Sequence, residues 1–210
     1  MNTLIVSAHP EPASFGRALA DAAMSALREL GHEVRLIDLY AEDFDPVVRP
    51  AQFLSRKDPT YFETMGEQAH AAAGGCVAAD VGASQQQLIW CDTLILHFPL
   101  WWWSMPAIMK GWIDRVFASD FAYGVRDLRH RRALLLVTAE TKAERFAATG
   151  PAHPLYHIEH GMLRFCGFEV LSPFIAADVW RATPAQRQAN VAQVAAHVHT
   201  LLGKRNAPRH

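Results

Sequence analysis

Short apolar runs alternate along the chain with longer stretches in which apolar and polar residues are mixed. A strand that is buried on both faces of a parallel sheet typically has a sequence of this kind, a short run of apolar residues. The pattern predicts five strands, over residues 3–8, 34–39, 93–98, 133–137 and 168–176.

Between these runs, apolar residues recur three and four positions apart, the spacing of one buried helix face. The first such stretch predicts a helix that begins after Ser14, a suitable N-cap, and ends before Gly31. The last predicts a helix over residues 184–202 with Thr183 as its N-cap. Two further helices are predicted, over residues 106–117 and from residue 154 up to Gly167.

A long connection, residues 40–87, separates the second and third predicted strands. It contains three prolines and a stretch of small residues, and we expect only two short helices in it, over 61–73 and 84–91. Connections of this length in a compact domain usually have a function of their own.

Alternating buried strands and helices indicate an α/β fold, with a parallel sheet that carries helices on both faces. Because crossovers are right-handed, five strands fit the doubly wound order 2-1-3-4-5. A ligand then binds where the order reverses, at the carboxyl ends of strands 1 and 3. We expect residues 1–203 to form a single domain and residues 204–210 a flexible tail.

Composition narrows the possible functions. The formal net charge of the 210 residues is -1, so no basic excess favours nucleic acid or an anionic membrane surface. No apolar run approaches the roughly 18 residues that span a bilayer, and the first strand leaves no room for a signal peptide. Three scattered cysteines indicate reduced thiols, so we expect a cytoplasmic protein.

The segment SAHPEPASFG, residues 7–16, leaves the first strand at the predicted switch point. It leads to a helix N-terminus, where free N–H groups favour an anion. His9 can donate a hydrogen bond to a phosphate, and Ser14 and Gly16 allow a close approach. The segment lacks the glycine and lysine patterns of the P-loop and of dinucleotide-binding folds. It therefore indicates a phosphate-binding loop, or else an ordinary turn that Ser14 caps.

Three consecutive tryptophans, Trp101 to Trp103, follow Pro99 at the end of the third strand. Consecutive side chains in extended chain point to opposite sides, so three indoles cannot all enter one core. They could stack on a flat aromatic ligand at the switch point, or form a tryptophan-rich dimer interface.

Two long segments, LIVSAHPEPASFGRALADAA and DTLILHFPLWWWSMPAIMKGWIDRVFASDFAYG, resemble the flavin-dependent NAD(P)H:quinone reductases. The segment HGMLRFCGFEVLSPFI also resembles this family. The resemblance covers most of residues 3–202 and is weakest over 50–84. It implies a flavodoxin-like fold and a flavin-binding homodimer with its sites at the subunit interface.

The resemblance also implies a role for particular residues. Those implied to bind the flavin in the first two loops are His9, Ser14, Phe15, Gly16, Pro99, Leu100, Trp101, Trp102 and Trp103. Trp102 and Trp103 would also line the pocket in which nicotinamide and quinone bind in turn. Phe121 and Tyr123 would reach that pocket from the partner subunit.

The loop after the fourth strand departs from the family pattern. Thr138 matches, but Ala139 and Glu140 stand where a Thr and a Gly are usual. Phe146 replaces the usual Tyr, and His153 lies within one residue of the usual His, so these two are the candidate catalytic positions. Without Gly, a left-handed backbone is strained, and we expect this cofactor-binding loop to follow another path.

A second histidine pair, His157 and His160, is spaced to share one helix face, which suits a metal. The only nearby acid, Glu159, would face elsewhere. We therefore expect no metal site here.

The predicted activity is the two-electron transfer of hydride from NAD(P)H, through a flavin, to a quinone by a ping-pong mechanism. The flavin is expected to be FAD, because residues 56–74 match extra chain in family members that hold the adenine half; FMN is the alternative. Alternative functions are a nitro- or azo-reductase on the same scaffold, and a redox-sensing regulatory subunit of a membrane transporter.

Overall fold

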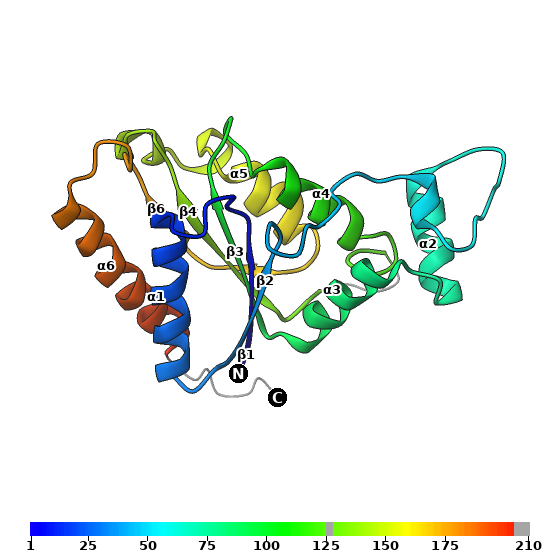
Figure 1. The fold of residues 1–210 in the computed structure, drawn as a ribbon, viewed down its shortest axis with the longest axis horizontal. Helices are drawn as coiled ribbons and strands as arrows, with labels where there is room; N and C mark the ends of the chain where they lie inside the picture. Colours follow the sequence, from blue (N-terminus) through cyan, green and yellow to red (C-terminus); the bar gives the residue numbers. More distant parts are fainter. Residues whose placement is uncertain (125–127, 204–210) are drawn as a thin grey trace.

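The sheet is parallel throughout in the computed structural model, which describes residues 1–124 and 128–203 (Figure 1). The strand order is β2-β1-β3-β4-β5, which confirms the predicted doubly wound topology. The predicted tail, 204–210, lies outside the described residues. The four long strands are β1 Asn2–Ser7, β2 Glu33–Asp38, β3 Thr93–Pro99 and β4 Arg132–Thr138.

The fifth strand position is filled by two short strands rather than one, which corrects the prediction of a continuous strand over 168–176. Both β5, Glu169–Val170, and β6, Phe174–Ala176, pair with β4. Pro173 lies between them. A proline has no N–H to donate, so the ladder is interrupted there.

Helices cover both faces of the sheet, as predicted (Figure 1). On one face α1, Phe15–Glu29, lies beside α6, Pro184–Leu202, and their apolar sides meet Ile5, Ile95 and Leu134 of the strands. On the other face α3, Ala79–Trp90, and α4, Ala107–Val116, contact the alternate strand residues. The strands are therefore buried on both sides, which explains their uninterrupted apolar runs.

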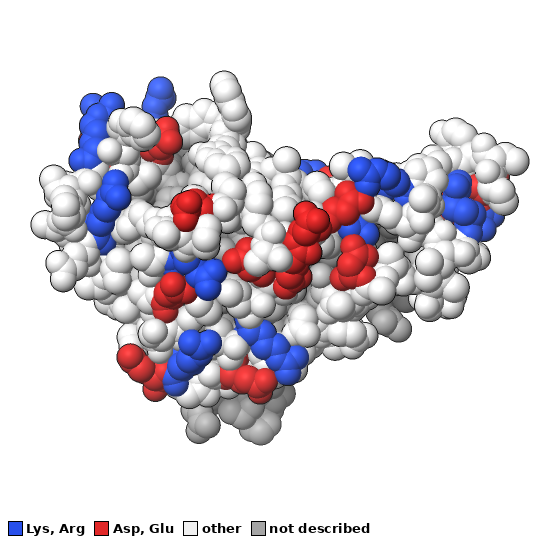
Figure 2. Space-filling model, in the orientation of Figure 1, with Lys and Arg blue, Asp and Glu red and all other residues white. Residues whose placement is uncertain are grey.

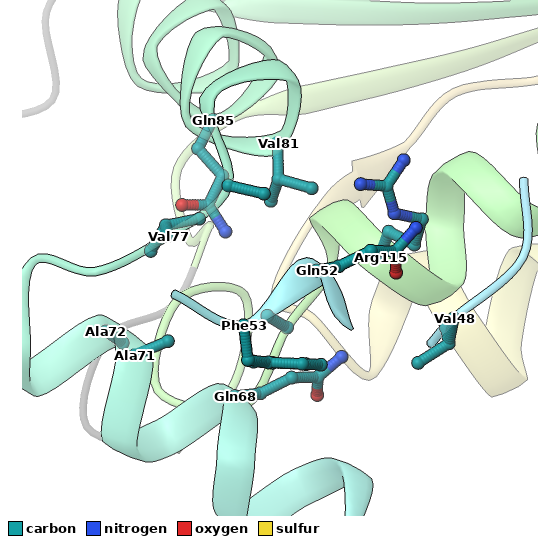
Figure 3. A pocket seen from close by; sticks show the side chains of 12 residues that line it. Val48, Gln52, Phe53, Gln68, Ala71, Ala72, Val77, Val81, Gln85 and Arg115 are labelled. Carbon is teal, nitrogen blue, oxygen red and sulfur yellow. The ribbon is translucent and has the colours of Figure 1, made fainter. Parts of the chain in front are cut away.

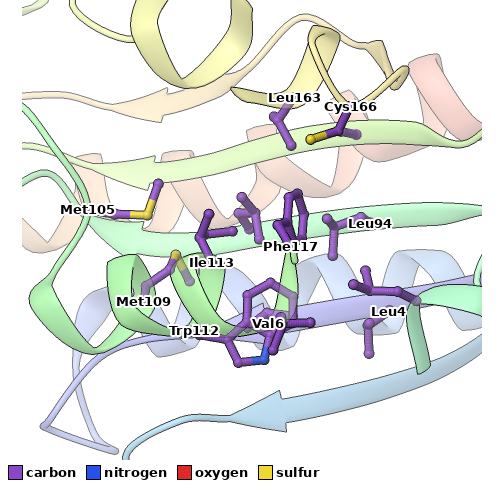
Figure 4. Close-up of a cluster of buried hydrophobic side chains, with 14 of the residues drawn as sticks. Leu4, Val6, Leu94, Met105, Met109, Trp112, Ile113, Phe117, Leu163 and Cys166 are labelled. Carbon is purple, nitrogen blue, oxygen red and sulfur yellow. The ribbon is translucent and has the colours of Figure 1, made fainter. Parts of the chain in front are cut away.

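Trp112 of α4 is the largest fully buried side chain of the second face (Figure 4). Its indole lies near Val6 and Leu94 of the sheet, and its Nε1 donates to Ser84 Oγ of α3 at 3.1 Å. The hydrogen bond satisfies the one polar atom of the indole, so the ring is buried without an unpaired donor. This contact fixes α4, which begins directly after the tryptophan segment.

The ends of two helices confirm the predicted caps. Ser14 Oγ accepts from the Arg17 N–H at 3.1 Å, and Thr183 Oγ1 accepts from the Gln186 N–H at 3.3 Å. Gly31 follows α1 with a φ of +78°, a conformation that costs glycine little.

The long connection is more helical than the sequence predicts, with α2 at Thr64–Gly74 and α3 beginning five residues before the predicted start. Its remaining chain includes the short helix η1 at Pro50–Gln52, and Glu67 holds residues 56–58. This almost fully buried carboxylate accepts from Arg56 Nε at 2.9 Å and from the Lys57 N–H at 2.8 Å. Burial raises the pKa of Glu67, but these hydrogen bonds outweigh burial and leave the pKa below its usual value.

The connection borders a small cavity of about 30 Å³ that is partly open to solvent, and Phe53 lies in the middle of its lining (Figure 3). Its polar side chains have partners in the chain: Gln68 Nε2 donates to the Asp114 carbonyl at 3.0 Å, and Gln85 Nε2 to the Val116 carbonyl at 3.2 Å. In Figure 1 this region lies at the opposite end of the long axis from α1.

The segment 154–167 is predicted to be helical, and the structure confirms a helix over most of it. Two short helices, η2 at Ala143–Phe146 and η3 at Gly150–Ala152, precede α5, Tyr156–Ile158. The chain then widens into a π-helix, η4, Glu159–Arg164. Such wide turns are rare and occur often near functional sites.

Candidate functional site at the carboxyl edge of the sheet

Three loops leave the carboxyl ends of β1, β3 and β4, and the backbone joins them directly. The Ala8 N–H donates to the His97 carbonyl at 3.0 Å, and the Leu100 N–H donates to the Thr138 carbonyl at 2.8 Å. The ends of the three strands therefore form one continuous edge at the switch point, where doubly wound sheets bind their ligands.

The first loop presents unpaired amides at the start of α1. Among the described residues, no hydrogen bond forms to the backbone N–H groups of Phe15 and Gly16. His9 Nδ1 contacts the backbone of Glu11, with its N–H nitrogen at 3.0 Å and its carbonyl oxygen at 3.1 Å, so Nε2 is the ring nitrogen that can donate to a ligand. Two free amides at a positive helix end and one imidazole donor suit a phosphate group.

Gly16 lies where the three strands converge. A Cβ on this residue would be 3.1 Å from His97 Nε2 of β3 and 3.7 Å from Thr138 Cγ2 of β4. The missing side chain thus allows the first turn of α1 to lie directly on the sheet. Gly16 therefore brings the free amides to the switch point. The sequence predicted only that Gly16 allows a phosphate to approach the loop.

His97 is a site feature that the sequence analysis missed. The ring is fully buried, and its Nδ1 lies 2.9 Å from Ser7 Oγ, while Nε2 has no hydrogen-bond partner in the described chain. Burial, then the nearby charges of His9 and Arg17, lower the pKa of His97 to about 4 despite the Gly16 carbonyl and Asp38. The ring is therefore neutral near pH 7. The available signal was a histidine inside an otherwise apolar strand.

The second loop is a two-residue hairpin formed by the tryptophans. Trp101 and Ser104 exchange both backbone hydrogen bonds, each at 2.9 Å. Trp102 and Trp103 between them have φ values of +50° and +61°, a pattern of the type I′ turn that favours Asn and Gly. The side chain of Trp102 projects fully into solvent, with 97% exposure. Bulky residues in the left-handed region are strained, and such strain concentrates at functional sites.

The third loop avoids the left-handed region, as its lack of glycine predicted. None of Thr138, Ala139 and Glu140 has a positive φ. Ala139 continues the ladder, since its N–H donates to the Ala176 carbonyl at 2.9 Å, and Glu140 is exposed. Further along, the rings of Phe146 and His153 lie 6.3 Å apart. In the described chain, neither side chain has a hydrogen bond or a ring contact with the first or second loop.

Phe121 and Tyr123 do not join the three loops within one chain. They follow α4, which runs from the tryptophan hairpin back across the sheet. Phe121 is buried in the core beneath α4, and the half-buried Tyr123 lies 5.5 Å from the exposed ring of Phe165. Their predicted role in the site requires a second subunit.

A second missed residue is Arg187, in the first turn of α6. Its guanidinium lies 5.7 Å from the centre of the Phe15 ring, beside the start of α1, and donates to the Val179 carbonyl at 3.4 Å. This cation adds positive charge near the free amides. The sequence gave no sign of it, because α6 follows the first loop by about 170 residues.

Other parts of the surface show different chemistry. Figure 2 shows acidic side chains gathered in the middle of one face, with basic ones scattered among them. A hollow beside β2 is lined by Glu42, Asp43, Asp45 and Asp80 together with Arg35. Mixed charge of this kind gives that face no basic stripe for a polyanion.

The described residues contain no group of three or more metal-ligating side chains close enough to hold an ion. His160 stacks on the Tyr156 ring at 4.2 Å instead. Nor does any helix within residues 1–124 and 128–203 have the length and apolar character to cross a membrane.

The comparisons with known proteins agree with this fold. A family described by its flavodoxin-like fold matches residues 1–202. Ribosyldihydronicotinamide dehydrogenase (quinone) of Homo sapiens is 33% identical over 216 residues, which cover 98% of this chain and 94% of that protein. The chain belongs to the NAD(P)H:quinone reductase family. It is thus an oxidoreductase with a flavodoxin-like fold, as the sequence motifs predicted.

Two further members of the quinone reductase family illustrate the similarity. NAD(P)H dehydrogenase (quinone) 1 of Cavia porcellus is 34% identical over 195 residues, covering 88% of this chain and 71% of that protein. The structure of a candidate quinone reductase from Klebsiella pneumoniae superposes with a TM-score of 0.89 at 38% identity, covering 96% of this chain and 85% of that chain.

Proposed function

We propose that this reductase binds a flavin at the carboxyl edge of the sheet and reduces quinones with NAD(P)H. The observation that carries the proposal is the free Phe15 and Gly16 amides beside an unpartnered buried nitrogen of His97, at the switch point. Free amides at a helix N-terminus suit the flavin phosphate. The adjacent exposed indoles suit a flat ring system.

The bound flavin would accept hydride from NAD(P)H and deliver it to a quinone in a ping-pong reaction. This chain holds and orients the reactants. His9, Ser14 and the first turn of α1 bind phosphate, and Arg187 adds positive charge there. The backbone of Pro99 to Trp103 and of Thr138 borders the aromatic part of the site.

In this proposal His153 is the residue that transfers a proton to or from the bound reactant. The family pattern has a tyrosine where this chain has Phe146, and a phenyl ring cannot donate or accept a proton. His153 lies next to Phe146 on the same loop, and its Nδ1 accepts from the Leu155 N–H at 3.3 Å. Because Nδ1 takes part in this contact, Nε2 is the ring nitrogen available to exchange a proton with a bound reactant.

A homodimer would complete the site. The half-buried Tyr123 and the exposed Phe165 form an aromatic pair beyond α4, beside the exposed Met65. Large exposed apolar side chains that lie together usually mark an interface. The partner's aromatic residues would then close the pocket next to the tryptophan hairpin.

The proposed flavin is FAD, with FMN as the alternative. The chain segment that suggested FAD, residues 56–74, folds around Glu67 at the far end of the molecule from α1 (Figure 1). Any contact between this segment and an adenine group must therefore be made across the dimer, to the partner's cofactor.

The test is to purify the protein, record its visible spectrum, identify the released flavin by chromatography, and titrate anaerobically with NADH and NADPH. We expect a yellow protein that is bleached in one two-electron step and reoxidised by a quinone. Reoxidation by azo dyes or nitroaromatic compounds but not by quinones would favour the azo- or nitro-reductase. Apoprotein that binds neither FAD nor FMN would refute the proposal, and a membrane partner that co-purifies would then favour the regulatory subunit.

A further inference from the structure

The neutral ring of His97 poses a problem of hydrogen bonding. Nε2 is fully buried and has no hydrogen-bond partner among the residues that the structure describes, and it has no surface exposed to solvent. A buried polar atom without a hydrogen bond costs on the order of 1–3 kcal/mol. A buried polar atom without a partner in a native fold therefore calls for a structural or functional explanation.

The direction of the missing hydrogen bond follows from the other side of the ring. Ser7 Oγ lies 2.9 Å from Nδ1, and a hydroxyl can donate to this nitrogen. Nδ1 then accepts, and the proton of the neutral ring lies on Nε2. The adjacent backbone is Gly16, whose absent Cβ would be only 3.1 Å from Nε2 and whose carbonyl favours a proton on this ring.

We propose that His97 is the positioning residue of the cofactor-phosphate site: in the cofactor-bound protein its Nε2–H donates to the Gly16 carbonyl and holds the first turn of α1 against the sheet. The free amides of Phe15 and Gly16 are then directed at the phosphate. Ser7 orients the imidazole, and Gly16 allows the close approach. This inference rests on the proposed flavin site.

Two substitutions separate the two ring nitrogens. In His97→Asn the side-chain amide can reach Ser7 but is too short to replace Nε2, whereas in His97→Gln it can extend to the position of Nε2. Thr93→Val is the matched control, because within residues 1–124 and 128–203 Thr93 Oγ1 is the other buried side-chain atom without a partner, and it lies at the start of the same strand.

The experiment is a titration of each apoprotein with FAD and with FMN at neutral pH, followed by flavin fluorescence. We expect His97→Asn to bind the flavin about tenfold more weakly than the wild type, equivalent to about 1.4 kcal/mol. His97→Gln should stay within about threefold, and Thr93→Val should be unchanged. Equal affinity of His97→Asn and wild type, or equal losses in both His97 variants, would overturn the proposal.

A second measurement does not depend on how the variants fold. The ring nitrogens of His97 in the wild-type protein are followed by ¹⁵N NMR before and after saturation with the flavin. We expect the Nε2 signal to shift as its hydrogen bond forms, and an unchanged signal counts against the proposal. Wild-type protein that binds no flavin would instead refute the proposed function itself.

Discussion

Replacement of Trp102 by glycine should stabilise this protein, although a large aromatic side chain is removed. Trp102 has a φ of +50° in the hairpin between β3 and α4, and its side chain is 97% exposed. The left-handed conformation costs a residue with a Cβ about 1–2 kcal/mol. Glycine adopts this conformation without that cost.

The magnitude follows from three contributions. Glycine relieves the left-handed strain. Its larger conformational freedom in the unfolded chain, however, lowers the free energy of unfolding by about 0.5–1 kcal/mol. Almost no burial is lost, since only a few per cent of the Trp102 surface is covered. The free energy of unfolding should therefore rise by about 0.5–1 kcal/mol. In a protein of this size, each kcal/mol raises Tm by roughly 2–4 °C.

Replacement of the neighbouring Trp103 by glycine should have the opposite effect and lower the stability. Trp103 has a φ of +61° but is only 45% exposed, so about half of an indole surface is buried. At about 25 cal/mol per Å², burial of half of a roughly 250 Å² side chain contributes about 3 kcal/mol. Trp103→Gly should therefore destabilise the protein by about 2 kcal/mol, despite the same relief of strain.

The assay is equilibrium unfolding in urea for both variants, with Trp180→Gly as a control. Trp180 is also largely exposed but has no positive φ, so its replacement should bring only the entropic loss. We expect Trp102→Gly to lower quinone turnover while it raises stability. A loss of stability in Trp102→Gly as large as that in Trp180→Gly would refute the strain argument.

Three further predictions concern other contacts. Gly16→Ala places a Cβ 3.1 Å from His97 Nε2, so flavin affinity should fall about tenfold in a fluorescence titration, while helix propensity keeps the stability change within about 1 kcal/mol. Glu67→Gln should lower the urea midpoint at pH 7. Because the folded-state pKa of Glu67 is lowered, this difference from wild type should shrink as the pH falls through that pKa, and a constant difference down to pH 3 would contradict it. Asp80→Asn removes the charge opposite the buried Arg115 and should cost about 2 kcal/mol in urea unfolding.

Local patterns in the sequence determined the scaffold of this protein. The apolar runs predicted the strands, because a strand buried on both faces must be apolar throughout. Ser14, Gly31 and Thr183 predicted helix ends, because capping depends on residues close together in the chain. The strand order, the switch point and the loops that meet there followed from chain topology.

Only the tertiary structure decided how these loops meet. The unpartnered nitrogen of His97, the Arg187 guanidinium beside Phe15 and the place of residues 56–74 all depend on contacts between distant segments. The split of the fifth strand likewise shows only in the separate pairing of β5 and β6 with β4. Periodicity records which side of an element is buried, but it carries no information on which distant atom lies opposite. For that reason the sequence predicted the edge of the sheet that holds the site, and the fold alone decided the atoms that face each other there.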